Sequence, residues 1–161
     1  MRSSVLILLV ACSAPTLNGG NWKVGEAQFK IGPKPEAWRQ VETIGSSAGF
    51  RDDPHEGSIL VGARCKVASD DAPLLALTMH LLMGTTERDI VSQDVIPFDG
   101  REAMHTVLRA KLDGVMMSYD VYVLKKDGCV HDFVYVAEAK NFDAGAPAFE
   151  HFVSGFHTTR E

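Results

Sequence analysis

The sequence lacks the motifs that would assign an activity directly. It has no glycine-rich phosphate loop, no GxSxG nucleophile motif and no HExxH metal motif. It also has no internal repeat, and no apolar run reaches the roughly 20 residues that span a bilayer. The formal net charge is −5, and the absence of a basic patch argues against nucleic-acid binding. We therefore expect a non-enzymatic protein with no catalytic residues, no metal and no cofactor.

Cysteine is scarce as well, with three residues in the chain of 161. The first of them ends an apolar stretch, Val5–Ala11, that follows Arg2 and is typical of an export signal. The segment Leu9-Val10-Ala11-Cys12 resembles the bacterial lipobox, in which the signal is cut before a cysteine that then carries lipid. The alternative is a buried N-terminal strand with an ordinary free cysteine.

This resemblance divides the chain into three parts. Residues 1–11 are expected to form a lipoprotein signal peptide, and residues 12–24 a lipidated Cys12 with a flexible tether rich in Ser, Gly, Asn and Pro. Residues 25–161 are expected to form a single domain, which is long enough to bury a real core. Several acyl chains hold a protein stably on a membrane. Because Ser13 rather than Asp follows Cys12, we expect the outer membrane, on its periplasmic face.

Cys65 and Cys129 remain after Cys12 is assigned to lipid. The periplasm is oxidising, so two leftover cysteines in an exported domain suggest a disulfide between them. Sequence alone does not show that the two residues approach within bonding distance. Two separate buried thiols are the alternative.

The strand pattern is clearest around Asp127-Gly128, a strong signal for a type I′ hairpin turn. A two-residue loop there places position 124 opposite 131 and position 122 opposite 133. Both faces of this hairpin are apolar, which predicts a place in the middle of a sheet with a layer packed on each face. Further strands are expected over 26–31, 59–67, 90–96 and 106–112, with a turn at Phe98-Asp99-Gly100-Arg101.

Two segments have helical spacing. Asp71 is expected to cap a helix that has Pro73 in its first turn and Gly84 at its end. Asn141 or Asp143 is expected to cap the last helix, with Pro147 in its first turn. The core stripe of that helix comprises Phe149, Phe152, Val153 and Phe156. Hairpins combined with helices favour an α+β fold with an antiparallel sheet.

The order of these elements resembles the superfamily of the photosystem II subunit PsbP, which includes DcrB-like and LpqN-like bacterial lipoproteins. The resemblance covers residues 25–156 as a pattern of elements, from Pro35-x-x-Trp38 to the closing "FEHFVSGF", and its nearest local motif is "FDGREA" at 98–103. It implies an antiparallel sheet sandwiched between helices, and a role in binding or scaffolding. It provides no shared site residues, and the Cys65/Cys129 pair matches no signature of the family.

Two clusters of side chains contain the residue types used for catalysis or metal binding, and we interpret both clusters as structural. Cys129 and His131 share one face of a strand, as a cysteine nucleophile and its base would. Both follow one tight turn, however, which favours a disulfide or core packing. The segment Asp52-Asp53-x-His55-Glu56 has donors for a divalent cation but not the spacing of a calcium loop, so we expect a solvated acidic loop.

Three functions remain open at this point. The leading one is a binding or scaffolding module of the cell envelope that contacts a protein partner and is held on the membrane through Cys12. The second is a carrier of a small ligand or lipid in a pocket between sheet and helix. The third is an envelope enzyme that uses Cys129 and His131, which requires a free, exposed Cys129 thiol.

Overall fold

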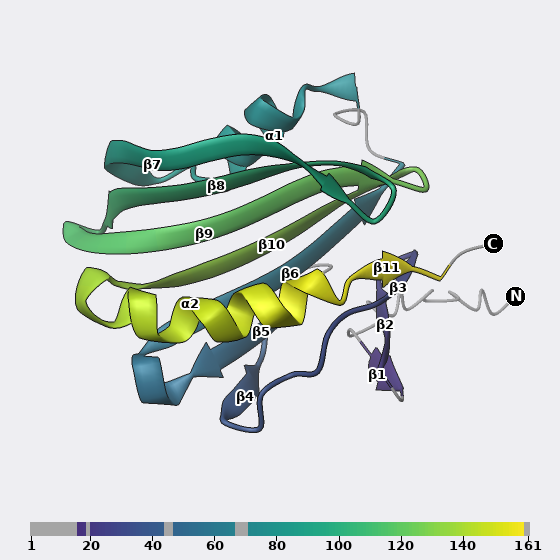
Figure 1. Cartoon of the computed structure of the whole chain (residues 1–161), viewed down its shortest axis with the longest axis horizontal. Helices are drawn as coiled ribbons and strands as arrows, with labels where there is room; N and C mark the ends of the chain where they lie inside the picture. The colour runs from purple at the N-terminus through teal and green to yellow at the C-terminus, as the bar shows by residue number, and fades with distance from the viewer. Residues whose placement is uncertain (1–15, 19, 44–46, 67–70, 160–161) are drawn as a thin grey trace, which may run out of the picture.

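The computed structural model describes residues 16–18, 20–43, 47–66 and 71–159, which form two antiparallel sheets and two α-helices (Figure 1). The larger sheet has seven strands in the order β4-β5-β6-β10-β9-β8-β7. These strands are β4 (Trp38–Val41), β5 (Ser47–Asp52), β6 (Gly57–Cys65), β7 (Thr85–Phe98), β8 (Arg101–Leu112), β9 (Val115–Lys126) and β10 (Cys129–Glu138). The helices are α1 (Leu74–Leu81) and α2 (Ala139–Ser154), and a 3-10 turn, η1 (Asp53–His55), follows β5. The fold class is α+β, as the sequence predicts.

The β9–β10 hairpin has the predicted register. Leu124 lies opposite His131, and Tyr122 lies opposite Phe133. The turn residues Asp127 and Gly128 have φ angles of 53° and 71°, the left-handed conformation that a type I′ turn requires at both positions. Since β10 also pairs with β6, the hairpin lies in the interior of the sheet.

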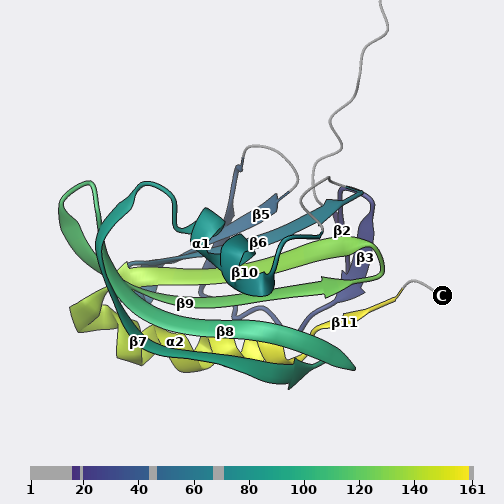
Figure 2. The ribbon, with the colours of Figure 1, turned by 90° about the horizontal axis from the view of Figure 1, so that it is seen from above.

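A helix covers each face of this hairpin. α2 runs along one face (Figure 1), where Leu124, Phe133 and Tyr135 are buried in the same cluster as Phe149 of the helix. α1 lies on the opposite face (Figure 2), over a cluster that includes Val121. Because α1 has only eight residues, it leaves other side chains of its face, such as Val134, partly buried. The two-sided burial predicted from the sequence is therefore confirmed.

The start of α2 differs from the prediction. The helix begins at Ala139 after Glu138, so neither Asn141 nor Asp143 is its cap, and Pro147 lies inside it rather than in its first turn. The additional turns are held by packing, because Phe142 and Ala146 are buried against the sheet. The ring centroids of Phe142 and Tyr135 lie 5.6 Å apart.

The start of α1 also corrects the prediction. Pro73 immediately precedes the helix and no side chain caps it, so Asp71 does not have the expected role. The chain leaves the helix at Leu82 and passes through Gly84, with a φ angle of 89°, into β7. That strand is an edge strand of 14 residues, twice the expected length. Its N-terminal half is exposed on both faces and therefore has no apolar alternation to mark it.

The smaller sheet has the order β1-β2-β3-β11. Its strands are β1 (Thr16–Asn18), β2 (Asn21–Val24), β3 (Ala27–Lys30) and β11 (His157–Thr158). Residues 21–24 were expected in the tether, but Trp22 and Val24 are buried in the core of the domain. The Trp22 ring makes edge contacts with Phe50 at 5.5 Å and with Phe152 at 6.4 Å. The folded domain therefore extends N-terminally beyond residue 25.

Candidate functional site

Cys65 and Cys129 lie directly opposite each other on β6 and β10, and a disulfide of 2.05 Å joins their sulfur atoms. The bond lies at the end of the sheet where the β9–β10 turn contacts Lys66, whose amide donates to the carbonyl oxygen of Gly128. Cys129 is 4% exposed. In this state Cys129 has no thiol to act as a nucleophile, so the geometry does not favour an enzyme based on Cys129 and His131.

His131 is a core residue on the α2 face of β10. It is 1% exposed, and its ring makes edge contacts with Phe29 at 5.6 Å and Phe156 at 5.1 Å. Neither ring nitrogen makes a hydrogen bond of ordinary geometry. Burial lowers the pKa of His131 to about 4, against a smaller opposing effect from the backbone of Lys126. The imidazole is therefore neutral at pH 7 and closed to solvent.

The acidic loop is only partly solvated, which corrects the expectation for Asp52. That carboxylate is 1% exposed and lies 2.8 Å from Nδ1 of His55. The hydroxyl of Tyr135 donates to it at 3.5 Å, so it links η1 to the sheet beneath α2. Asp53 behaves as expected, since it is exposed and pairs with Arg39 at 3.2 Å. Among the described residues, no group of three or more His, Cys, Asp or Glu side chains is placed to hold a metal ion.

Two further buried carboxylates have partners within the protein. The Asp132 carboxylate forms an ion pair with Arg64 on the α1 face of the sheet, with 2.9 Å between Oδ2 and Nη1. Burial raises the pKa of Asp132, and the Arg64 guanidinium opposes that shift. Asp120 lies 2.8 Å from Nε2 of His105. Each pair joins side chains from two neighbouring strands, β6 with β10 and β8 with β9, and therefore stabilises the sheet rather than forming an open site.

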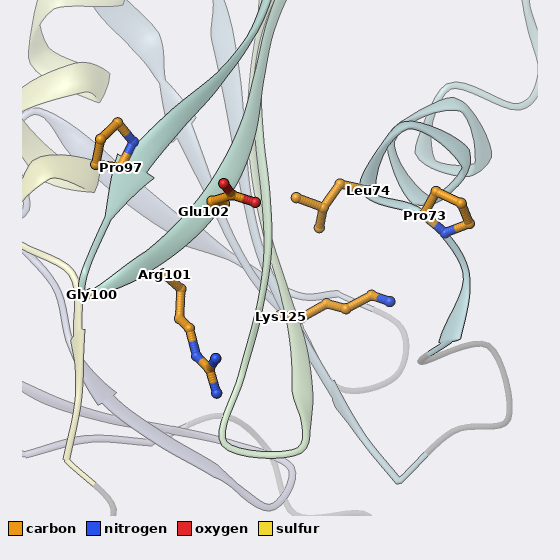
Figure 3. A pocket seen from close by; sticks show the side chains of 7 residues that line it. All are labelled: Pro73, Leu74, Pro97, Gly100, Arg101, Glu102 and Lys125. Carbon is orange, nitrogen blue, oxygen red and sulfur yellow. The ribbon is translucent and has the colours of Figure 1, made fainter.

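An open pocket of about 770 Å³ lies between the start of α1 and the β7–β8 turn (Figure 3). Its lining residues are Pro73, Leu74, Pro97, Gly100, Arg101, Glu102 and Lys125. A second hollow of about 260 Å³ adjoins it at the β9–β10 turn, and Arg101 and Lys125 line both. The size falls in the range of small-molecule sites, which is roughly 300–1,000 Å³.

The charged groups of this pocket have no partners within the described residues. The side chains of Arg101, Glu102 and Lys125 make no hydrogen bond or ion pair with the described residues, and Figure 3 shows them pointing in different directions. Lys126, by contrast, is held by the Asp99 carboxylate at 2.6 Å. The pocket thus combines two cations and one anion with apolar walls. From the sequence Arg101 is predicted to lie in a turn, and no sequence pattern indicates that these three residues line one pocket.

The opposite end of the long strands has exposed apolar side chains. We call this surface, around the β8–β9 turn and the end of α1, the β8–β9 end. It comprises Met83, Leu112, Val115 and Met116, which are 64%, 41%, 50% and 40% exposed. Leu112 pairs with Val115 across the turn and with Thr85 of β7, so these side chains share one face of the sheet end, whereas Met116 pairs with Lys111 and points to the other face. Apolar side chains gathered on the surface often mark an interaction site.

Neither helix of the described part of the chain is long and apolar enough to cross a membrane.

Comparison with known proteins identifies the fold. No family model and no curated protein match the sequence. Solved structures do match, among them the cyanobacterial PsbP of Synechocystis sp. PCC 6803, with a TM-score of 0.60 and 14% identity over 96% of this chain and 98% of that one. LpqN, which is involved in cell envelope biogenesis of Mycobacterium tuberculosis, has a TM-score of 0.59 and 13% identity over 91% and 90%. The Ran-binding protein Mog1p of Saccharomyces cerevisiae has a TM-score of 0.55 and 12% identity over 83% and 90%. The chain therefore has the PsbP-like fold that the sequence predicts, and identities this low concern the fold alone.

Proposed function

We propose that this protein is a non-enzymatic binding module of the cell envelope. It is anchored to the periplasmic face of the outer membrane by lipid on Cys12, and it contacts an envelope protein through the β8–β9 end. The observation that carries the proposal is the exposure of Met83, Leu112, Val115 and Met116 around one turn, at the end of the long strands, in a domain whose core is two clusters of buried apolar side chains. Leu75, Ile90, Val91 and Val95 are also exposed, but they lie outside this turn.

The position of the anchor supports this arrangement. From residue 12 to Thr16 the chain spans at most about 15 Å, because consecutive Cα atoms are 3.8 Å apart. Thr16 pairs with Lys23, close to the β2–β3 turn. Figure 1 shows the smaller sheet at one end of the molecule and the β8–β9 turn at the other. β8 has 12 residues, which corresponds to roughly 35–40 Å. A lipid on Cys12 therefore directs the β8–β9 end away from the membrane, toward a partner.

Two further observations support a binding role. The disulfide removes the thiol that an enzyme based on Cys129 would require. LpqN, which has the same fold, is involved in cell envelope biogenesis, and Mog1p, also of this fold, binds Ran. The scaffold thus occurs in an envelope protein and in a protein that binds another protein.

The anchor is tested by the Cys12→Ser substitution and metabolic labelling with a palmitate analogue. We expect the parent chain to be labelled and recovered in the outer-membrane fraction. The variant should be unlabelled and should remain as precursor. Label that persists on the Cys12→Ser chain would contradict the proposed anchor.

The docking surface is tested by placing a charge on it. Val115→Glu introduces a carboxylate at a half-exposed position, the first residue of β9, where it does not disturb the core. After chemical crosslinking in cells, proteins recovered with the parent chain should be depleted at least tenfold with Val115→Glu. They should be retained with Ala144→Glu, which makes the same charge change at an exposed position of α2. Equal recovery with both variants would exclude the β8–β9 end as the docking surface.

A further inference from the structure

We infer that the pocket between α1 and the β7–β8 turn binds a zwitterionic phospholipid headgroup, a phosphodiester joined to a primary ammonium. The phosphate lies near Arg101 and Lys125, and the ammonium lies near Glu102. This site is at the opposite end of the strands from the proposed docking surface. The inference rests on the pocket alone and does not require the anchor at Cys12.

The charges of the pocket carry the inference. Arg101 comes from the β7–β8 hairpin and Lys125 from β9, and both line the main pocket and the adjoining hollow. Neither has a partner among the described residues, so both are available to an anion. Arg and Lys are the side chains that bind phosphate, Arg by paired hydrogen bonds and Lys as a point charge.

Glu102 makes the pocket unsuitable for a simple dianion. Its carboxylate lies on the α1 side, toward Leu74, whereas Arg101 points away from it (Figure 3). A bare phosphate would gain from the two cations but would be repelled by this carboxylate. A ligand with both a phosphate and a primary ammonium matches all three charges. A quaternary ammonium matches less well, because it has no N–H to donate to Glu102.

The walls of the pocket suit the part of a lipid next to its headgroup. Pro73, Leu74 and Pro97 line it with apolar surface, which can cover the first methylenes of the acyl chains. The contacts around the pocket also place it beside the smaller sheet. Lys66 links the adjoining hollow to the smaller sheet. Its amide donates to Gly128, which lines that hollow, and its ammonium pairs at 2.9 Å with Glu26, which lies between β2 and β3. Thr16, four residues after Cys12, belongs to the same smaller sheet, where it pairs with Lys23. The pocket therefore lies at the end of the domain that the proposed anchor holds near the membrane.

The experiment uses short-chain lipids that stay monomeric in water, together with the purified full-length protein labelled with ¹⁵N. The probes are dihexanoyl phosphatidylethanolamine, dihexanoyl phosphatidylcholine and inorganic phosphate. We expect the ethanolamine lipid to give saturable shifts of the Gly100, Arg101 and Lys125 amide signals. Its Kd should be about tenfold lower than that of the choline lipid, the effect of one charge-assisted hydrogen bond. Inorganic phosphate should give no saturable shift.

Matched variants separate the two halves of the site. Glu102→Gln should remove the preference for ethanolamine over choline while it retains binding. Arg101→Glu combined with Lys125→Glu should weaken binding of both lipids more than tenfold. Arg109→Glu combined with Lys140→Glu is the control, since this pair makes the same charge change at exposed positions outside this pocket.

Three results would overturn the inference. Equal affinity for the two lipids in the parent protein would exclude the contact of the ammonium with Glu102. Saturable binding of inorganic phosphate with equal affinity would identify a plain phosphate site instead. The absence of shifts at these three amides with every probe would exclude the pocket. None of these results bears on the β8–β9 end, so failure here is distinguishable from failure of the proposed docking function.

Discussion

The hydroxyl group of Tyr135 on β10 occupies the space that a Cβ atom on Gly145 of α2 would require. Helix and sheet are therefore in direct contact at this point, and a side chain on Gly145 would also meet the Asp52 carboxylate. In an exposed helix, Gly→Ala stabilises by about 1 kcal/mol. Here we expect Gly145→Ala to lower the free energy of unfolding by about 1–3 kcal/mol, because Tyr135 has to move.

The measurement is chemical denaturation of the parent, Gly145→Ala, Tyr135→Phe and the double variant. Removal of the Tyr135 hydroxyl should relieve part of the clash, so the double variant should be more stable than the sum of the two single changes predicts. If Gly145→Ala raised the stability, the close packing of α2 on β10 would be incorrect.

Neighbouring aspartates at η1 should differ sharply in their effect on stability. Asp52→Ala removes a buried carboxylate and leaves the Tyr135 hydroxyl without its acceptor, which should cost about 2–3 kcal/mol. Asp53→Ala removes an exposed ion pair and should cost less than about 1 kcal/mol. Thermal or urea unfolding of the two variants gives the comparison. Equal losses would mean that Asp52 is solvated after all.

Stability should fall in mild acid because of His131. Its pKa is about 4 in the folded protein and near 6.5 when unfolded, so the unfolded chain binds an extra proton between these values. Above pH 6.5, His131 should therefore add no pH dependence to the free energy of unfolding. It should decrease as the pH falls from 6.5 to 4, by about 3 kcal/mol at most.

Comparison with His131→Phe isolates this effect. The variant should lack the His131 contribution to the slope, whereas His151→Gln, at an exposed position of α2, should retain it. Asp132 acts in the opposite direction because its pKa is raised by burial, but it is present in all three chains and cancels in the comparison. Identical pH profiles for the parent and His131→Phe would show that His131 is accessible to protons in the folded state.

Cys65 and Cys129 should be oxidised to each other in the mature protein. The bond joins residues 64 positions apart. Closing a loop of that length contributes about 4 kcal/mol in the chain-entropy model. Digestion without reductant should yield one linked peptide pair, and reduction should lower the unfolding midpoint. Complete alkylation of both cysteines in unreduced, denatured protein would exclude the bond.

The parts of the fold that sequence predicts well are those with a local signal. Asp127-Gly128 specifies its own turn, and the apolar residues on either side fix the hairpin register. The helix positions were less accurate because packing, not capping, sets their ends. Phe142 packs on Tyr135 and extends α2 beyond the position that Pro147 suggested.

The candidate surfaces could not be predicted from sequence for a different reason. Leu112 continues the alternation of Thr106, Leu108 and Ala110, which are all buried. It is nevertheless exposed, because it lies at the end of β8 where only a short helix covers that face of the sheet. The pairing of β8 with β9 brings Arg101 and Lys125 to one pocket, and no local sequence pattern predicts that pairing.

The central claim is that the β8–β9 end contacts a protein partner in the cell envelope. The most direct measurement is site-specific photocrosslinking in living cells, with a photoreactive residue at position 115 in one strain and at position 150, on the exposed side of α2, in another. The account predicts a discrete crosslinked species from position 115. That species should be absent from position 150, and it should be lost from position 115 when Leu112→Glu is also introduced. Crosslinks that form from position 150 but not from position 115, or that persist with Leu112→Glu, would contradict it.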